Sequence, residues 1–438
     1  MLVLVLKESS PCRRLITFRG CSRVDPLSEE TKARIVEYVL KNGGELDFTK
    51  HFWRNCEHLP VHVIQYQKFA EAHRMFRQGK NQVEVAEQVE VSKATASNWS
   101  RVDNMPKLCH YLAAFLTLGP PTDGKVWLTL EQTHGHGVPI GQFVQVPTVI
   151  SSWNDVATII REIVPLESAT GQSREYLFGF LVGIMIGDAH KPKQGHSHRH
   201  IELTLSKKYD TSVKIGEFTS LCARRFGLRM ERFEDVPKPE DKPHGFFNWR
   251  SQSSPFVDWI FNVVMGLEDG QHTTYDPIRM DWAIDSPRDF RVGLVQGIAE
   301  SDGSVSVASQ TVEFWVIPDW DFMIKLCASL GLRAFRNREA VSLVKSQAIM
   351  SFKVPVFSEQ LQTVRYQLLR LLATTPKLER KDRLPELIRL DIATLAVEGH
   401  SVPDIVVEVA RTRGLLVSFE AAQRWARKAL AKPTQPKE

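Results

Sequence analysis

The feature that most constrains this chain is a helical motif of small residues that occurs twice, 114 residues apart. The first copy contains Gly179, Gly183, Gly187 and Asp188, and the second has Gly293, Gly297, Ser301 and Asp302 at the matching positions. Residues four apart lie on one face of a helix. An interior glycine costs about 1 kcal/mol of helix stability relative to alanine. The repeat therefore predicts two helices that pack unusually closely through these positions.

Each copy ends in an aspartate, so the packed helices would bring two carboxylates together at one end. A carboxylate at a helix C-terminus opposes the helix dipole, and a second carboxylate nearby adds repulsion. Divalent cations bound between Asp188 and Asp302 would offset both effects.

Similar patterns follow the two motifs. After the first come a predicted strand at 200–205, a helix at 211–226, a strand at 245–252 and a helix at 255–264. After the second come strand-like alternation at 303–316, a helix at 320–330, a hairpin pairing 340–344 with 349–354, and a helix at 357–372. Each half reads as αββαββα, so the predicted class is α+β, with tandem repeats related by a pseudo-two-fold axis and two sheets forming one saddle.

The segments Leu181-Val-Gly-Ile-Met-Ile-Gly-Asp-Ala189 and Val295-Gln-Gly-Ile-Ala-Glu-Ser-Asp-Gly303 resemble the two LAGLIDADG motifs of single-chain, DOD-type homing endonucleases. The resemblance covers residues 175–372, with halves at 175–268 and 289–372. It implies that Asp188 and Asp302 are catalytic and bind two or more Mg²⁺ ions. It also implies that the saddle lies in the major groove of double-stranded DNA and that the catalytic domain is monomeric.

The sequence departs from the family pattern in two places. Ala189 replaces the terminal glycine of the first motif, and Glu300 has no acidic counterpart in the first motif. Family members often carry a basic residue near the end of each half's sheet. Three residues are candidates for that role: Arg250, Lys345 and Lys353.

Residues 62–117 are predicted to be helical, and 75–102 resembles a helix-turn-helix. Ala86 would lie where two helices cross, and Ser92 is a suitable N-cap for the second helix. Glu90 occupies the turn position where glycine is common. The residues expected to face DNA are Lys93, Thr95, Ser97, Asn98 and Arg101. A generic helical bundle is the alternative.

Residues 384–431 form a possible second helix-turn-helix, because Ser418 and Trp425 repeat the spacing of Ser92 and Trp99. Its expected phosphate contacts are Arg411, Arg413, Arg424, Arg427 and Lys428. A solvated charged helix is the alternative. The remaining segments are 1–61, of unknown role, and 118–174, expected to be a linker with a small β/α segment.

The net charge of +5 is mild, but residues 189–232 hold ten Lys/Arg against four Asp/Glu, a local +6. Such a block suits a phosphate-rich partner, although a solvated face has the same composition.

Six histidines lie in segments without a set of carboxylates or cysteines that could complete a metal site, so they are expected to be exposed or phosphate-binding rather than metal ligands. They are His134, His136, His190, His196, His198 and His200. Six scattered cysteines predict neither disulfides nor a zinc site. With no apolar run near twenty residues, the chain is expected to be intracellular (cytoplasmic, with DNA), without membrane contact.

These observations favour a metal-dependent DNA endonuclease whose choice of site is aided by the helix-turn-helix. Two alternatives stay open. One is a transcriptional regulator that has the same saddle without catalysis, and the other is an RNA maturase.

Overall fold

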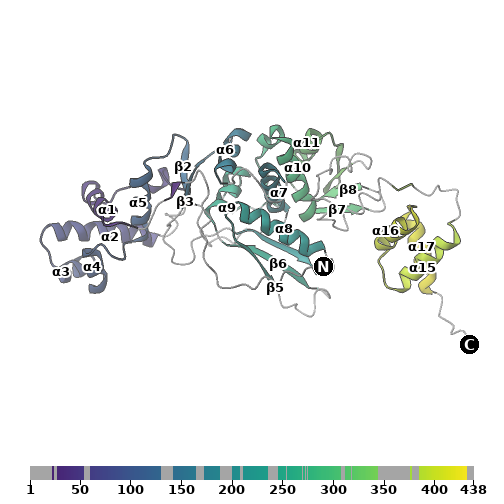
Figure 1. Cartoon of the computed structure of the whole chain (residues 1–438), viewed down its shortest axis with the longest axis horizontal. Helices are drawn as coiled ribbons and strands as arrows, with labels where there is room; N and C mark the ends of the chain where they lie inside the picture. Colours follow the sequence, from purple (N-terminus) through teal and green to yellow (C-terminus); the bar gives the residue numbers. More distant parts are fainter. Residues whose placement is uncertain are drawn as a thin grey trace, which may run out of the picture.

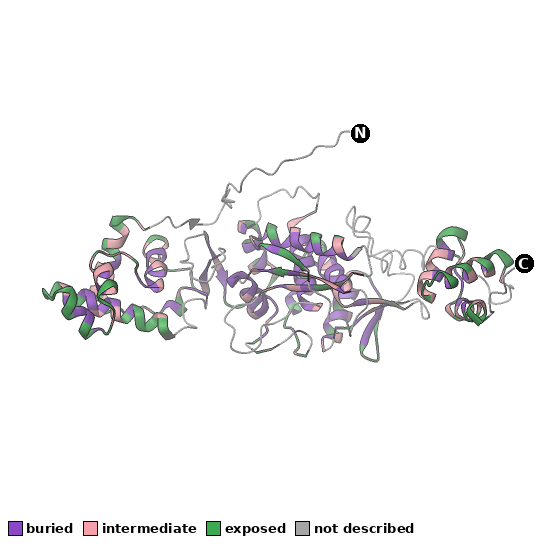
Figure 2. Ribbon diagram, turned by 90° about the horizontal axis from the view of Figure 1, so that it is seen from below, coloured by how far each residue is buried: buried purple, intermediate pink, exposed green. Residues whose placement is uncertain are grey.

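The computed structural model describes residues 22–23, 27–53, 60–129, 142–163, 172–187, 200–207, 211–234, 245–252, 254–268, 270–271, 273, 275–306, 311–316, 318–343, 375–376 and 384–431. Figure 1 shows an N-terminal helical region, a central mixed region and a C-terminal three-helix unit, one after another along the longest axis. Buried residues are concentrated in the cores of the first two regions (Figure 2). Within the described ranges, no helix is long and apolar enough to cross a membrane.

The N-terminal region consists of α1 (Glu29–Asn42), α2 (Pro60–Arg77), α3 (Gln82–Gln88), α4 (Lys93–Ser100) and α5 (Lys107–Leu118), with a 3₁₀ turn at Phe48–Lys50. The side chain of Ser28 caps α1, which ends at Gly43 with a φ of 64°. Ile35 and Val39 of α1 lie in the same apolar core as Trp99 of α4. Residues 27–53 are therefore packed onto the predicted helix-turn-helix.

A small antiparallel sheet lies between the N-terminal and central regions. Its strands are β1 (Ser22–Arg23), β2 (Lys125–Thr129) and β3 (Gln142–Pro147), in the order β1-β3-β2. Because successive side chains of a strand point to opposite faces, Trp127 and Phe143 join the N-terminal core while Leu128 and Val144 join the central core. Helix α6 (Trp153–Ile163) also packs into the central core. Much of 118–174, expected to be a linker with a small β/α segment, therefore packs against the cores of both regions.

The first half of the central region contains α7 (Arg174–Gly187), β4 (Glu202–Ser206), α8 (Thr211–Arg225), β5 (Met230–Glu234), β6 (Phe246–Ser251) and α9 (Pro255–Trp259), which continues as a π-helical turn at Ile260–Val264. Its antiparallel strands have the order β4-β6-β5. Helix α8 packs on one face of the sheet so closely that a Cβ on Gly216 would lie 2.1 Å from the ring of Trp249. The strand β5 was not predicted from the sequence.

The second half contains α10 (Arg288–Ser301), β7 (Gly303–Ser306), β8 (Thr311–Phe314), α11 (Trp320–Ser329), β9 (Ala334–Asn337) and β10 (Ala340–Leu343), preceded by a 3₁₀ turn at Asp281–Asp285. The antiparallel order is β7-β8-β10-β9. The predicted pairing of 340–344 with 349–354 is wrong for β10, which pairs with β9 and β8. Residues 344–374, including the predicted helix at 357–372, lie outside the described residues.

A second internal repeat joins helix to strand in the two halves. Leu221-Cys-Ala223 recurs as Leu326-Cys-Ala328 near the ends of α8 and α11. Each is followed by a Gly-Leu-Arg segment, whose glycines, Gly227 and Gly331, have φ of 76° and 80°. Both cysteines are fully buried. The same left-handed turn therefore leads from the helix into the edge strand, β5 or β9, of each sheet.

The C-terminal unit consists of α15 (Glu386–Val397), α16 (Val402–Arg413) and α17 (Phe419–Ala431). Ser401 caps α16, and Gly414 ends it with a φ of 63°. Ile392, Ile405, Val409 and Ala426 are among the residues that form its small core.

Candidate functional site

The contact between α7 and α10 is made through their glycines. A Cβ on Gly179 would lie 2.1 Å from the carbonyl oxygen of Phe290, and one on Gly293 would lie 2.2 Å from that of Tyr176. Real Cβ atoms do not approach backbone this closely, so a larger residue would force the helices apart. The small residues thus set the separation of the two helix backbones.

The end of α7 lies directly against the end of α10. A Cβ on Gly187, the last residue of α7, would meet the Ser301 side chain and lie 3.2 Å from the backbone nitrogen of Asp302. Asp188 follows Gly187 in the sequence but is outside the described residues. The position of the Asp188 carboxylate relative to Asp302 therefore stays a prediction.

Asp302 is the C-cap of α10 and is held by its backbone. Its N–H donates to the carbonyl of Ile298 (2.9 Å), and its carbonyl accepts from the N–H of Trp315 (3.0 Å). Two residues earlier, Glu300 is 3% exposed, and its Oε1 accepts a hydrogen bond from Gln296 Nε2 (2.7 Å). Two acidic side chains thus lie at the negative end of the helix dipole, where cations are favoured. No cluster of three His, Cys, Asp or Glu suited to a metal occurs among the described side chains.

Of the three candidate basic residues, only Arg250 can be placed. Its guanidinium donates to Glu202 Oε1 (2.9 Å), and Glu202 also contacts His200 Nε2 (3.1 Å). Burial alone would raise the pKa of Glu202, but the hydrogen bonds from Arg250 and His200 outweigh it and lower that pKa. Arg250 is therefore held by an acid on the sheet face opposite α8. Lys345 and Lys353 lie outside the described residues.

Trp315 lies next to Asp302, and the sequence analysis did not single it out. It follows β8, is 47% exposed, and its indole N–H donates to Ser304 Oγ (3.0 Å). Together with its backbone bond to Asp302, this fixes a large aromatic side chain beside the candidate site. An exposed tryptophan after an alternating strand was the only available signal.

In the N-terminal region, α3 and α4 pack on each other and on α2. Asn81 and Glu84 form a capping box on α3, and Ser92 Oγ accepts from the N–H of Thr95 at the start of α4. Ala86, Ala96 and Trp99 are buried between the helices. Glu90, at the turn, has a φ of 52°, so it adopts the left-handed conformation that glycine favours.

The five residues expected to face DNA are all at least partly exposed. Lys93 and Arg101 are exposed, and Thr95, Ser97 and Asn98 are half-buried. Arg101 bonds to the Ser97 carbonyl (3.4 Å) and to Asn98 Oδ1 (3.1 Å). Asn98 would therefore have to release Arg101 before it paired with a base.

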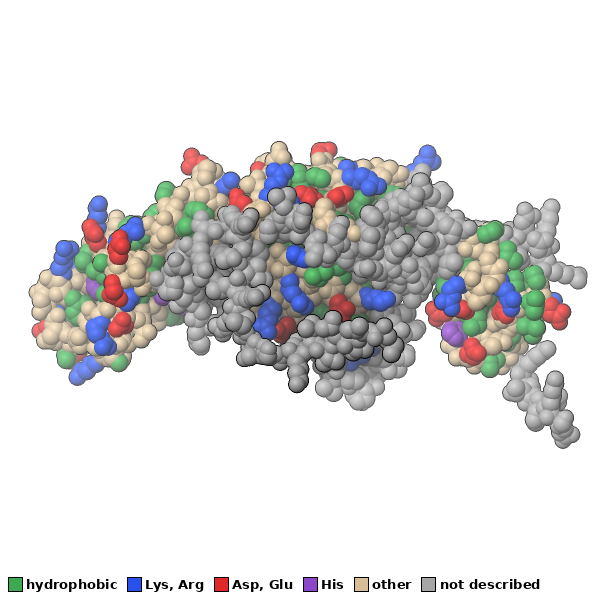
Figure 3. Space-filling model, in the orientation of Figure 1, with side chains coloured by type: hydrophobic (Ala, Val, Ile, Leu, Met, Phe, Trp, Pro, Cys, Tyr) green, Lys and Arg blue, Asp and Glu red, His purple; other side chains and the backbone are tan. Residues whose placement is uncertain are grey.

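The C-terminal unit shows basic and acidic side chains side by side (Figure 3). Arg413 makes two hydrogen bonds to Asp391, which lower the pKa of that carboxyl, and Arg411 pairs with Glu408 (2.8 Å). Arg424, Arg427 and Lys428 are exposed on α17. Of the five predicted phosphate contacts, two are thus already engaged by carboxylates.

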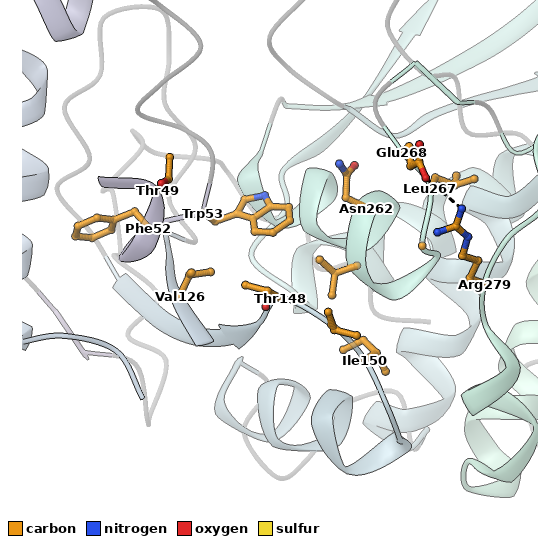
Figure 4. A pocket seen from close by; sticks show the side chains of 13 residues that line it. Thr49, Phe52, Trp53, Val126, Thr148, Ile150, Asn262, Leu267, Glu268 and Arg279 are labelled. Atoms are coloured by element: carbon orange, nitrogen blue, oxygen red, sulfur yellow. Dashed lines mark hydrogen bonds and ion pairs between the residues drawn. The ribbon is translucent and has the colours of Figure 1, made fainter. Parts of the chain in front are cut away.

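A cavity of about 760 Å³ lies between the N-terminal and central regions (Figure 4). Trp53 borders it on one side, and Asn262 and the ion pair of Glu268 with Arg279 (3.1 Å) border it on the other. The indole N–H of Trp53 donates to Asp258 of α9 (2.9 Å). Asp302 is not among the residues that border this cavity, whose lining mixes apolar side chains with polar and charged ones.

No family model matches the chain, and no curated protein matches it. Solved structures similar to it include the homing endonuclease I-DmoI in complex with DNA and Mn, with 12% identity, a TM-score of 0.30, and coverage of 42% of this chain and 99% of that chain. The homing endonuclease I-WcaI, bound to its DNA recognition sequence, is similar at 12% identity and a TM-score of 0.29, covering 46% and 91%. The N-terminal LAGLIDADG domain of WhiA is similar at 15% identity and a TM-score of 0.27, covering 49% and 99%. At these TM-scores, the similarity supports no conclusion about the activity of this chain.

Proposed function

We propose that this chain is a metal-dependent DNA endonuclease of the LAGLIDADG type. In this proposal, the tandem αββαββα halves at 175–268 and 289–372 form a pseudo-two-fold saddle, and α7 and α10 are its axis. The supporting observation is that the glycine-lined contact of these helices ends with Gly187 beside the backbone of Asp302. Asp188 is the next residue of the chain, and in this proposal its carboxylate lies beside that of Asp302.

Asp188 and Asp302 would hold the divalent ions, two or more Mg²⁺, between the helix ends. The carboxylate of a C-cap aspartate suits a cation, because the helix dipole and the nearby Glu300 both favour positive charge there. Bound ions would activate water and stabilise the charge that develops on the phosphate. The two glycine-packed helices would hold the carboxylates at a fixed separation.

In the same proposal, double-stranded DNA lies across the two sheets, and one monomeric chain supplies both aspartates. The helix-turn-helix at 62–117 would add affinity and part of the sequence preference. Residues 384–431 would contribute further phosphate contacts through Arg424 and Arg427. The chain would act where DNA is found inside the cell.

A second candidate is a DNA-binding regulator that does not cleave. It is favoured by the ion pair of Arg250 with Glu202, which engages the one candidate basic residue that can be placed. The third alternative is an RNA maturase, which selective binding of structured RNA would distinguish from the other two.

The test is to incubate the full chain with a library of random double-stranded DNA sites and Mg²⁺, and to sequence both bound and cleaved molecules. An endonuclease yields a defined cleaved site, and Asp302→Asn abolishes cleavage while retaining binding, because the amide keeps the size of the side chain but loses its charge. Cleavage by Asp302→Asn at the wild-type rate contradicts the assignment of the site. Selective binding without cleavage supports the regulator, and selective binding of structured RNA alone supports the maturase.

A further inference from the structure

A row of charged side chains crosses the first sheet on the face that α8 leaves uncovered. Glu202 of β4, Arg250 of β6 and Glu231 of β5 lie opposite one another in the strand register. Trp249, the neighbour of Arg250, packs against α8, and successive side chains of a strand point to opposite faces. The row therefore lies on the open face of the sheet, where DNA lying across the two sheets would bind.

The second half has the same row without its central cation. The edge strands β5 and β9 follow the same Gly-Leu-Arg turn, which aligns the two sheets residue by residue. In this alignment the row reads Glu202, Arg250 and Glu231 in the first half and Glu313, Ser342 and Phe335 in the second. The first acid recurs in both halves, but the arginine is replaced by a buried serine. The fold of such a sheet therefore does not require an arginine at this position.

Arg250 and Glu202 hold a donor group and an acceptor group side by side. Nη2 of Arg250 donates to Oε1 of Glu202 (2.9 Å), and Oε2 of Glu202 contacts Nε2 of His200 (3.1 Å). The side chain of Arg250 is 53% exposed, whereas that of Glu202 is 18% exposed. Glu231, at the other end of the row, pairs with Arg229. A guanidinium carries several N–H donors in a fixed fork, and each carboxylate oxygen can accept more than one hydrogen bond, so both groups can bind a further partner.

This pair of groups matches the edge that a G·C base pair presents in the major groove. Guanine offers two acceptors there, N7 and O6, and the N4 amino group of the paired cytosine is a donor. An arginine fork binds N7 and O6 together, and a carboxylate accepts from N4. An A·T pair presents the adenine N6 donor and the thymine O4 acceptor instead, so it would place a donor against the arginine and an acceptor against the carboxylate.

We propose that Arg250 and Glu202 together read one G·C base pair, with Arg250 on the guanine and Glu202 on the cytosine, in the half-site bound by the first half of the central region. This inference rests on the proposed function, because it requires that DNA lie across the two sheets. It makes Arg250 a specificity-determining residue and not the basic residue of the cleavage site. Because Ser342 occupies the matching position, the equivalent base pair of the other half-site carries no such preference.

The experiment incubates the full chain with random duplexes, without divalent metal so that no cleavage occurs, and sequences the bound molecules. We expect wild type to select a G·C pair at one position in one half-site. Arg250→Lys keeps the positive charge but loses the fork of donors. Preference at that position should therefore fall by about 5- to 150-fold, while the other selected positions persist.

Glu202→Ala tests the acceptor of the pair. It should reduce preference at the same position but tighten binding to all duplexes, because it removes a negative charge from the face that meets the phosphates. A purely structural ion pair would give a different result, since its loss would lower the unfolding temperature without changing which base is selected.

Arg232→Lys is the matched control, because Arg232 lies opposite Trp249 on the helix-covered face of the same sheet. It should leave base selection unchanged. The inference is overturned if wild type binds selectively but Arg250→Lys selects the same bases. It is equally overturned if Arg250→Lys slows cleavage of all sites in Mg²⁺ without altering base selection, because Arg250 then acts at the cleavage site. If the library yields no bound duplex, the proposed function fails, and the reading of the base pair fails with it.

Discussion

Gly183 of α7 and Gly297 of α10 face each other where the two helices cross. A Cβ on Gly183 would lie 2.9 Å from the Cα of Gly297, and one on Gly297 would lie 2.8 Å from the Cα of Gly183. Each added carbon would also press on a carbonyl oxygen of the opposite helix, at 2.3 Å and 2.2 Å. Neither contact involves a flexible side chain, so the helices themselves would have to move.

This contact predicts that Gly183→Ala and Gly297→Ala destabilise the central region, by about 1–3 kcal/mol from overpacking. Helix propensity alone predicts the opposite sign, because alanine is better than glycine by about 1 kcal/mol in a helix interior. Gly183→Leu should be worse than Gly183→Ala. Denaturant unfolding of the full chain provides the measurement, and a stability gain in both alanine variants would show that the helices do not pack through these residues.

The helix pair was predictable because its signal is local in sequence and occurs twice. The mixed fold with small antiparallel sheets is confirmed at that coarse level. The strand pairing of β10 was not predictable, because β9 contains Arg336 and Asn337 and lacks clear apolar alternation, as expected for an exposed edge strand. The register of this strand pair depends on the tight turn at Arg338 and on contacts with α11. Neither of these can be predicted from the periodicity of a single sequence.

The candidate site was predictable only in part. Asp302 follows from the repeated motif, but Trp315 is placed beside it by the antiparallel pairing of β8 with β7. Likewise, the engagement of Arg250 by Glu202 follows from their cross-strand register in β4 and β6. Contacts that depend on register between strands distant in sequence could not be read from composition or spacing.

Glu90 adopts a left-handed conformation in the turn between α3 and α4, with a φ of 52°. Relief of about 1–2 kcal/mol of backbone strain should exceed the extra folding entropy of glycine, about 0.5–1 kcal/mol. Glu90→Gly should therefore stabilise the N-terminal region by about 0.5–1 kcal/mol, because the surface contact of Lys68 with Glu90 contributes little. Glu87→Gly, within α3, is the control and should destabilise the region. If both variants lower the unfolding temperature by the same amount, the backbone at Glu90 is not strained.

Asp319 is 7% exposed, and its carboxyl accepts the backbone N–H of Ile278 (3.1 Å). Burial raises its pKa from 3.8 to about 7, although the hydrogen bond from Ile278 opposes the shift. Because the folded state holds this proton more tightly, its contribution to stability is present below pH 4 and is lost as the pH rises through 7. Asp319→Asn keeps the acceptor and removes the charge, so it should unfold at a higher temperature than wild type at pH 8. A lower unfolding temperature at that pH would contradict this account.

His73 responds to pH in the opposite direction. It is 7% exposed between Phe69 and Phe76, and burial lowers its pKa to about 4, although a backbone hydrogen bond involving Trp99 opposes the shift. Its contribution to stability is present above pH 6.5 and is lost as the pH falls toward 4. His73→Phe should make the N-terminal region less sensitive to acid, as measured by its unfolding temperature between pH 7 and 4. His400→Phe, at an exposed site on the C-terminal unit, should leave that sensitivity unchanged.

Lys93 and Asn98, on the same helix α4, should affect DNA binding differently. Lys93 is exposed beside the N-cap Ser92, where an ammonium can reach a phosphate. Lys93→Ala should weaken binding nearly equally for all sequences and reduce the salt slope by about 0.9, because one fewer counterion is released. Titrations of selected and scrambled duplexes over a range of salt concentrations measure both effects.

Asn98 can pair with adenine through its amide once Arg101 releases its Oδ1. Asn98→Ala should therefore relax preference at one base position, by about 1–3 kcal/mol, and leave the salt slope unchanged. Arg101→Ala frees the Asn98 amide but removes a cation. Selectivity among bases should therefore persist in this variant, while the salt slope of binding falls. If Asn98→Ala weakens binding to all sequences alike, α4 does not read bases through this residue.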